Sequence, residues 1–161
     1  VDITPERAEK YDFSTPYAFN RTAVITKADD DSINTLEDLK GKKTANTISS
    51  TYAELAEQYG ATVTGVDDLN QTFELLLSGR IDATLNAEMT FYDYTKEHPD
   101  ANVKIAVLTD DANRIAIPMR KGDETAALRT AIDAAIDELR ADGTLKALSE
   151  KYFGRDISTE E

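Results

Sequence analysis

The stretch from residue 3 to residue 17 reads Ile3-Thr4-Pro5-Glu6-Arg7-Ala8-Glu9-Lys10-Tyr11-Asp12-Phe13-Ser14-Thr15-Pro16-Tyr17. Thr4 is a typical N-cap residue, Pro5 suits the first position of a helix, and Glu6 complements the positive end of the helix dipole. Pro16 forces the residue before it into an extended conformation. The pattern therefore predicts a helix of about two turns, followed by an extended segment.

Arg7 lies on this short helix, and its role has two interpretations. A guanidinium group that is held in place can bind a carboxylate through two parallel hydrogen bonds. An exposed arginine more often pairs with an acidic neighbour, here Glu6, Glu9 or Asp12. The pattern alone favours the surface ion pair.

The composition is that of a soluble globular protein with an acidic surface. Of the 161 residues, 40% are hydrophobic and 30% are charged, which suits one domain, or one lobe with part of another. Lys and Arg number 18 against 31 Asp and Glu, for a net charge of −13. This charge argues against nucleic acid and anionic lipid as partners, because both require a basic surface.

The residue types that carry most catalytic and metal chemistry are scarce. Cysteine is absent, which excludes disulfides, thiolate zinc sites and a cysteine nucleophile. His98 is the single histidine, and its position before Pro99 predicts a solvated helix end rather than a catalytic triad. The acidic run Asp29–Asp31 lacks the glycine and glutamate of a calcium loop. We therefore expect no metal and no cofactor.

Strand and helix patterns alternate along almost the whole chain. Strands are expected at residues 22–26, 43–47, 61–66, 81–85, 103–108 and 114–119, the last two separated by the polar residues 109–113. Helices are expected at residues 5–10, 35–40, 51–59, 69–78, 89–96, 128–141 and 145–153. Leu69, Phe73, Leu76 and Leu77 are interpreted as core. The alternation predicts an α/β fold with a parallel or mixed sheet between helices.

Two junctions between a strand and a helix are candidate binding sites. Ser49, Ser50 and Thr51 supply three hydroxyl groups where backbone amides are free, so they predict an anion site, with plain helix capping as the equal alternative. Asn86 to Glu88 follow another strand, and ligands of open α/β folds gather where strands end.

The first motif resembles one found in the family 3 extracellular solute-binding proteins, which are receptors of amino-acid ABC importers. Further segments match the family in order and spacing: residues 35–42, 79–83, 139–145 and 151–154. Thr84-Leu85-Asn86 and Phe91–Tyr94 look most like the cystine-binding branch. In that family the first motif lies about a third of the way along the chain. The resemblance therefore implies that the present chain is truncated at its N-terminus.

The resemblance implies the type II periplasmic-binding-protein fold, with two lobes joined by crossing strands. Residues 1–20 and 112–161 would form part of lobe 1, and residues 21–111 would form a complete lobe 2. Hinges would lie near residues 18–21 and 110–114. The first lobe would be incomplete, so we expect either self-association, such as a domain swap, or a missing partner segment.

The resemblance also implies roles for individual residues. Arg7 would bind the α-carboxylate of an amino acid. Asp2 lies where relatives often carry a threonine or serine that contacts the same group, so its side chain would repel the ligand unless the backbone amide makes the contact. Ser49, Ser50 and Thr51 would close on the ligand from lobe 2, and Asn86 or Glu88 would meet its ammonium group. Ala87 stands where relatives usually have the aspartate that binds this ammonium group. The site is therefore expected to lack one partner.

The function that the resemblance favours is the binding component of an ABC importer, without enzymatic activity. It would bind a polar amino acid, with cystine favoured, by hinge closure and would deliver it to a membrane permease. Its location would be extracytoplasmic, either periplasmic or anchored by a lipid at the cell surface. The alternatives are an enzyme similar to cyclohexadienyl dehydratase, with Glu88 as the acid or base, and a ligand-sensing module.

Overall fold

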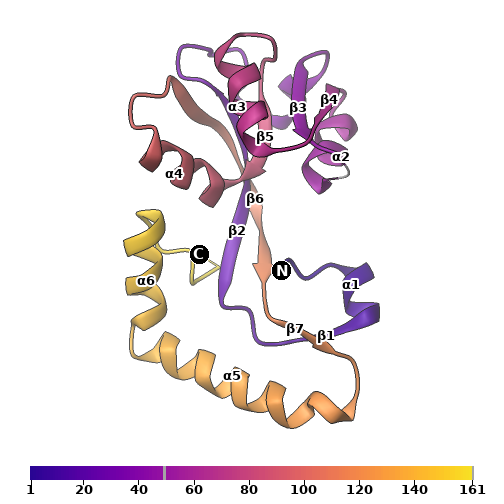
Figure 1. Cartoon of the computed structure of the whole chain (residues 1–161), viewed down its shortest axis with the longest axis vertical. Helices are drawn as coiled ribbons and strands as arrows, with labels where there is room; N and C mark the ends of the chain where they lie inside the picture. The colour runs from indigo at the N-terminus through magenta and orange to yellow at the C-terminus, as the bar shows by residue number, and fades with distance from the viewer. Residues whose placement is uncertain (49, 161) are drawn as a thin grey trace. The chain divides into compact units, whose positions relative to one another are not determined.

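The computed structural model describes residues 1–48 and 50–160, and the chain divides into two compact units (Figure 1). Unit 1 comprises Val1–Asn20 and Asp111–Glu161, and unit 2 comprises Arg21–Asp110. Strands β2 (Ala18–Lys27) and β6 (Val103–Ile115) each run from one unit into the other (Figure 1).

Unit 2 contains parallel and antiparallel strand pairs, as the alternating pattern predicts. β3 (Lys43–Thr47) pairs in parallel with β4 (Thr62–Val66), and a single parallel bridge joins Thr44 to Ala83. β5 (Thr84–Ala87) pairs antiparallel with β2, which lies between β5 and β6. The carboxyl ends of β3, β4 and β5 therefore lie at one edge, where the helices α2 (Thr51–Gln58), α3 (Leu69–Leu77) and α4 (Glu88–Glu97) begin.

Helices cover both faces of these strands. α3 (Leu69–Leu77) and α4 (Glu88–Glu97) pack on one face, with Phe73 and Leu76 buried. α2 (Thr51–Gln58) and the 3-10 helix η1 (Leu36–Leu39) pack on the other. Successive side chains of a strand point to opposite faces, so β2 contributes to both cores: Ala23 and Ile25 pack under α3 and α4, and Val24 packs under α2 and η1.

Unit 1 places the first motif against the end of β6 and the segment after it. Asp2 bridges to Ile115, and α1 (Pro5–Lys10) follows. β1 (Tyr11–Phe13) then pairs antiparallel with β7 (Pro118–Arg120). The 3-10 helix η2 (Asp123–Thr125) leads into α5 (Ala126–Ala141) and α6 (Thr144–Phe153).

Side-chain hydrogen bonds connect α5 to the segment after β1. The Thr15 amide donates to Asp133 at 2.6 Å, and Arg140 donates to the Pro16 carbonyl at 2.6 Å. These bonds satisfy the Thr15 amide and the Pro16 carbonyl, which lie between β1 and β2.

Three details of the predicted fold are wrong. β6 is one strand through the polar residues 109–113, because a strand that runs between two units needs no apolar face there. β5 begins at Thr84 and extends to Ala87, two residues beyond the predicted end. Leu77 is 38% exposed on α3, so it does not belong to the core.

Candidate functional site

Arg7 is held by local bonds of the first motif. The Thr4 hydroxyl accepts the Arg7 amide at 3.2 Å, which confirms Thr4 as the N-cap. The Arg7 Nη1 atom donates to the Asp2 carbonyl at 2.9 Å. A guanidinium group has five N–H donors, so this bond orients the group and leaves donors for an anion.

Two of the three acidic neighbours proposed as surface partners of Arg7 pair with other cations. Glu6 pairs with Lys10 at 3.1 Å, and Asp12 pairs with Arg129 at 3.5 Å. Lys121 donates to the carbonyl groups of Ala8 and Glu9 at the end of α1. Glu6 and Asp12 are therefore engaged by cations other than Arg7.

Asp2 contacts Arg7 through its backbone carbonyl. The residue is fixed by its bridge to Ile115 and by the bond from the Ile3 amide to the Arg114 carbonyl at 2.9 Å. Its role in the structure is to orient the guanidinium group. The predicted contact between its amide and a ligand stays a prediction.

The hydroxyl cluster at the start of α2 is partly described. Ser50 is the N-cap, and its Oγ accepts the Ala53 amide at 3.1 Å. This bond is the capping alternative, but a hydroxyl group that accepts one hydrogen bond can still donate another. Thr51 is the first helical residue and is exposed. Ser49, also predicted to bind the ligand, lies outside the described residues.

The second junction joins β5 directly to α4. The Asn86 side chain accepts the Ala87 amide at 2.8 Å, and Ala87 is the last residue of the strand. Glu88 begins α4 but is only 1% exposed, and its Oε1 accepts the Arg21 amide at 3.1 Å. The Glu88 carboxylate is therefore engaged in the interior of unit 2, which disfavours a role as the acid or base of an enzyme.

The sequence motifs did not predict a buried asparagine, Asn46, at the same edge of the strands. Asn46 on β3 donates through Nδ2 to the Leu85 carbonyl at 2.6 Å, while its Oδ1 has no partner among the described residues. This bond connects the ends of β3 and β5, the two strands that lead to the predicted binding residues. Only its position in a strand of small residues could have indicated burial.

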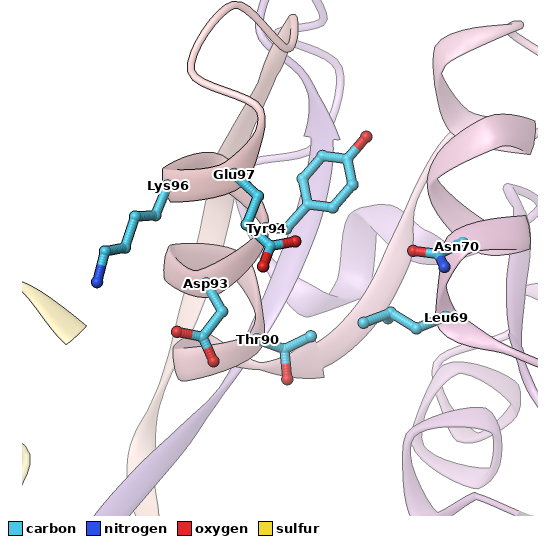
Figure 2. A pocket seen from close by; sticks show the side chains of 7 residues that line it. All are labelled: Leu69, Asn70, Thr90, Asp93, Tyr94, Lys96 and Glu97. Carbon is cyan, nitrogen blue, oxygen red and sulfur yellow. The ribbon is translucent and has the colours of Figure 1, made fainter. Parts of the chain in front are cut away.

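A groove of about 730 Å³ lies between the start of α3 and one side of α4 (Figure 2). Its lining residues are Leu69, Asn70, Thr90, Asp93, Tyr94, Lys96 and Glu97. Thr90, Asp93 and Glu97 recur at helical spacing, whereas Lys96 extends away from Asn70 (Figure 2). The spacing is visible in the sequence, but the proximity of α3 is not.

Tyr94, which lines this groove, stacks on Phe73 of α3. The rings of Phe73 and Tyr94 are parallel, with centroids 3.6 Å apart. Burial, together with the nearby Glu74 carboxylate, raises the pKa of the Tyr94 phenol. Tyr94 therefore remains a neutral donor at physiological pH.

The described residues hold no group of three or more acidic or histidine side chains arranged to bind a metal ion. The aspartates at residues 29–31 contact Asn102, Ser32 and Lys104 instead.

The His98 ring lies beside Tyr94 at the end of α4. No helix among the described residues has the length and apolar character needed to cross a membrane.

Comparison with known proteins identifies the family. Residues 1–155 match the bacterial extracellular solute-binding proteins, family 3. A probable amino-acid ABC transporter-binding protein of Haemophilus influenzae is 40% identical over 155 residues, covering 96% of this chain and 60% of the relative. The L-cystine-binding protein TcyJ of Escherichia coli is 39% identical over 163 residues, covering 98% of this chain and 59% of the relative.

A solved structure supports the same assignment. The L-cystine solute receptor of Neisseria gonorrhoeae, in its unliganded open conformation, superposes with a TM-score of 0.76 at 39% identity. The match covers 97% of this chain and 65% of the receptor. The chain belongs to the family 3 extracellular solute-binding proteins, and its fold is the type II periplasmic-binding-protein fold.

The family is one of binding proteins rather than enzymes, in agreement with the sequence-based prediction. The chain spans about 60% of the length of the curated relatives that it matches. Arg7 and Asp2 belong to unit 1, whereas Ser50, Thr51, Asn86 and Glu88 belong to unit 2.

Proposed function

We propose that the chain is part of the substrate-binding component of an amino-acid ABC importer and that its ligand is a polar amino acid, with L-cystine favoured. The observation that carries the proposal is its 39% identity to two proteins named for L-cystine, across nearly the whole chain. The half-buried guanidinium group of Arg7 is compatible with the carboxylate of such a ligand.

Arg7 is the residue proposed to bind the α-carboxylate of the ligand. The Asp2 carbonyl orients the guanidinium group, and the cap of α1 fixes the backbone that carries it. A bidentate pair between guanidinium and carboxylate adds direction to the attraction between opposite charges. Lysine could supply the charge but not the two parallel hydrogen bonds.

Ser50 and Thr51 are proposed to bind the ligand from unit 2, together with the first amides of α2. Ser49 is retained in this proposal from the sequence alone. Ligand binding would select a closed arrangement of two lobes, formed by residues 1–20 with 112–161 and by residues 21–111. The relative from Neisseria gonorrhoeae, described as open when unliganded, supports such a movement.

The ammonium group of the ligand is proposed to meet Asn86 rather than a carboxylate. Ala87 removes the usual charged partner, and the Glu88 carboxylate already accepts a backbone amide. A neutral acceptor gives a weaker bond than a charged one. We therefore expect a lower affinity than that of a relative with aspartate at this position.

An exported binding protein needs a membrane partner and an extracytoplasmic location. We propose an ABC permease as the partner and the periplasm or the outer cell surface as the location, because the curated relatives include proteins named as ABC transporter-binding. The descriptions of the family and its relatives support the proposal.

Residues 1–161 alone are proposed to self-associate through unit 1. α5 and α6 expose large apolar side chains: Leu128, Leu139, Leu148 and Tyr152. Grouped apolar side chains of this kind drive association, whereas a net charge of −13 opposes it. Sedimentation velocity should show dimers or larger species that increase with salt concentration. A compact monomer at all salt concentrations would contradict this proposal.

Calorimetric titration of the whole protein with L-cystine and a panel of other amino acids tests the proposed ligand. We expect saturable binding of L-cystine or of another polar amino acid. The absence of binding across the panel would remove the proposed specificity. Formation of phenylpyruvate from prephenate would instead support the enzyme alternative.

A further inference from the structure

The first residues of unit 2 on β2 lie just beyond the end of β5. In this antiparallel pair, Thr22 is opposite Ala87, the last residue of β5. The next pair along the ladder would be Arg21 and Glu88, but Glu88 already begins α4. The chain therefore leaves β5 and enters α4 at Glu88, so no β5 residue is left to pair with Arg21 on β2.

The side chain of Glu88 supplies the hydrogen-bond acceptor that a further residue of β5 would have supplied. Its Oε1 accepts the Arg21 amide at 3.1 Å, and the residue is 1% exposed. On the next residue, the Thr22 amide donates to the hydroxyl group of Thr109 on β6 at 3.0 Å. Side chains from α4 and β6 thus bind the first two amides of unit 2 on β2.

An unsatisfied polar atom lies where β2 passes from unit 1 into unit 2, between Asn20 and Arg21. Asn20 is the last residue of unit 1 on this strand, and its buried Oδ1 has no partner among the described residues. An unsatisfied buried acceptor raises the free energy of the arrangement that contains it. Only an arrangement that gave this acceptor a partner would relieve the cost, while the bonds to Arg21 and Thr22 oppose a change within unit 2.

We propose that Glu88 is a positioning residue that fixes β2 at Arg21 and so confines movement between the units to the residues before it. The inference rests on the hinge closure proposed above. Glu88 directly follows Asn86 and Ala87, so it connects the proposed ligand-binding residue Asn86 to β2, the strand that runs between the units. Its role is thus to transmit and limit movement rather than to contact the ligand.

Burying a carboxylate costs free energy, because the group loses its hydration. Leucine has a similar size and would remove the desolvation cost of the carboxylate, but it has no acceptor for the Arg21 amide. Glutamine keeps an acceptor oxygen at nearly the same place. Glu88→Leu and Glu88→Gln therefore separate packing from hydrogen bonding.

The first readout is hydrogen exchange of single amides in the whole protein without ligand. Glu88→Leu should accelerate exchange of the Arg21 amide by about tenfold or more, as expected when a hydrogen bond to a charged group is lost. The Ile25 amide, deeper in β2, should change little. Glu88→Gln should restore most of the protection of Arg21.

The second readout measures movement between the units directly. The chain has no cysteine, so Glu57→Cys and Glu138→Cys, both exposed, allow two spin labels to be attached, one in each unit. Glu88→Leu should broaden the distribution of distances between the labels, and Glu88→Gln should not. If Glu88→Leu fails to fold, Thr109→Val, compared with Thr109→Ser, tests the equivalent bond to Thr22.

The outcomes separate this inference from the proposed function. Unchanged exchange at Arg21 and an unchanged distance distribution in Glu88→Leu would overturn the inference, as would equal effects of leucine and glutamine. If L-cystine and the amino-acid panel do not bind but Glu88→Leu still broadens the distribution, the proposed ligand fails while the positioning role stands.

Discussion

Asp38 illustrates how a single side chain organises a turn of unit 2. Its carboxylate accepts the backbone amides of Asn34 at 2.9 Å and Thr35 at 3.0 Å, at the start of η1. These hydrogen bonds lower the pKa of the Asp38 carboxyl. The bonds favour the ionised form in the folded state, because a protonated carboxyl is a weaker acceptor.

The lowered pKa predicts a specific dependence of stability on pH. The stabilisation by Asp38 is fully present above the unfolded pKa, about 3.9, and is lost as the pH falls through the lower folded pKa. Melting temperatures of the protein and of Asp38→Asn should therefore differ most at pH 5 and converge towards pH 3. A difference that stays constant over this range would show that ionised Asp38 has no such role.

At the level of elements, the packing of α3 against α4 depends on Phe73. This ring is 1% exposed and stacks on Tyr94, so its removal eliminates buried area and the stacking contact together. Phe73→Ala should lower the free energy of unfolding by about 3–5 kcal/mol, measured by urea denaturation.

Leu77 provides the matched control on the same helix. It is 38% exposed, so Leu77→Ala should cost less than about 1 kcal/mol. Equal losses in the two variants would contradict the assignment of α3's buried face. A small loss in Phe73→Ala would do the same.

The same residues show how far the sequence could predict the elements. Helical spacing placed Phe73 and Leu76 in the core, but it could not separate Leu77, which lies at the margin of the apolar stripe. Local patterns also identified the N-cap Thr4, and they left helix capping by Ser50 or Thr51 as an alternative to an anion site; the N-cap is Ser50. They missed the continuity of β6, because a strand that carries polar residues on both faces has no alternation to detect.

Long-range contacts were the least predictable part of the candidate site. The bond from Arg7 to Asp2 is local, yet the position of Asp2 depends on Ile115, more than a hundred residues later. Glu88 looked like a ligand residue because it follows a strand, and only the structure shows that its carboxylate accepts the Arg21 amide. The proximity of α3 to α4 likewise required the fold.

At the level of the whole molecule, the central claim is that Arg7 binds the carboxylate of an amino acid. Calorimetric titration of L-cystine into the whole protein and into Arg7→Met tests it, with Arg7→Lys as a control that retains the charge. Loss of a buried charge partner costs about 2–5 kcal/mol, so Arg7→Met should weaken binding by about thirtyfold or more, and Arg7→Lys by less. An affinity for L-cystine that is the same in the protein and in Arg7→Met would contradict the claim.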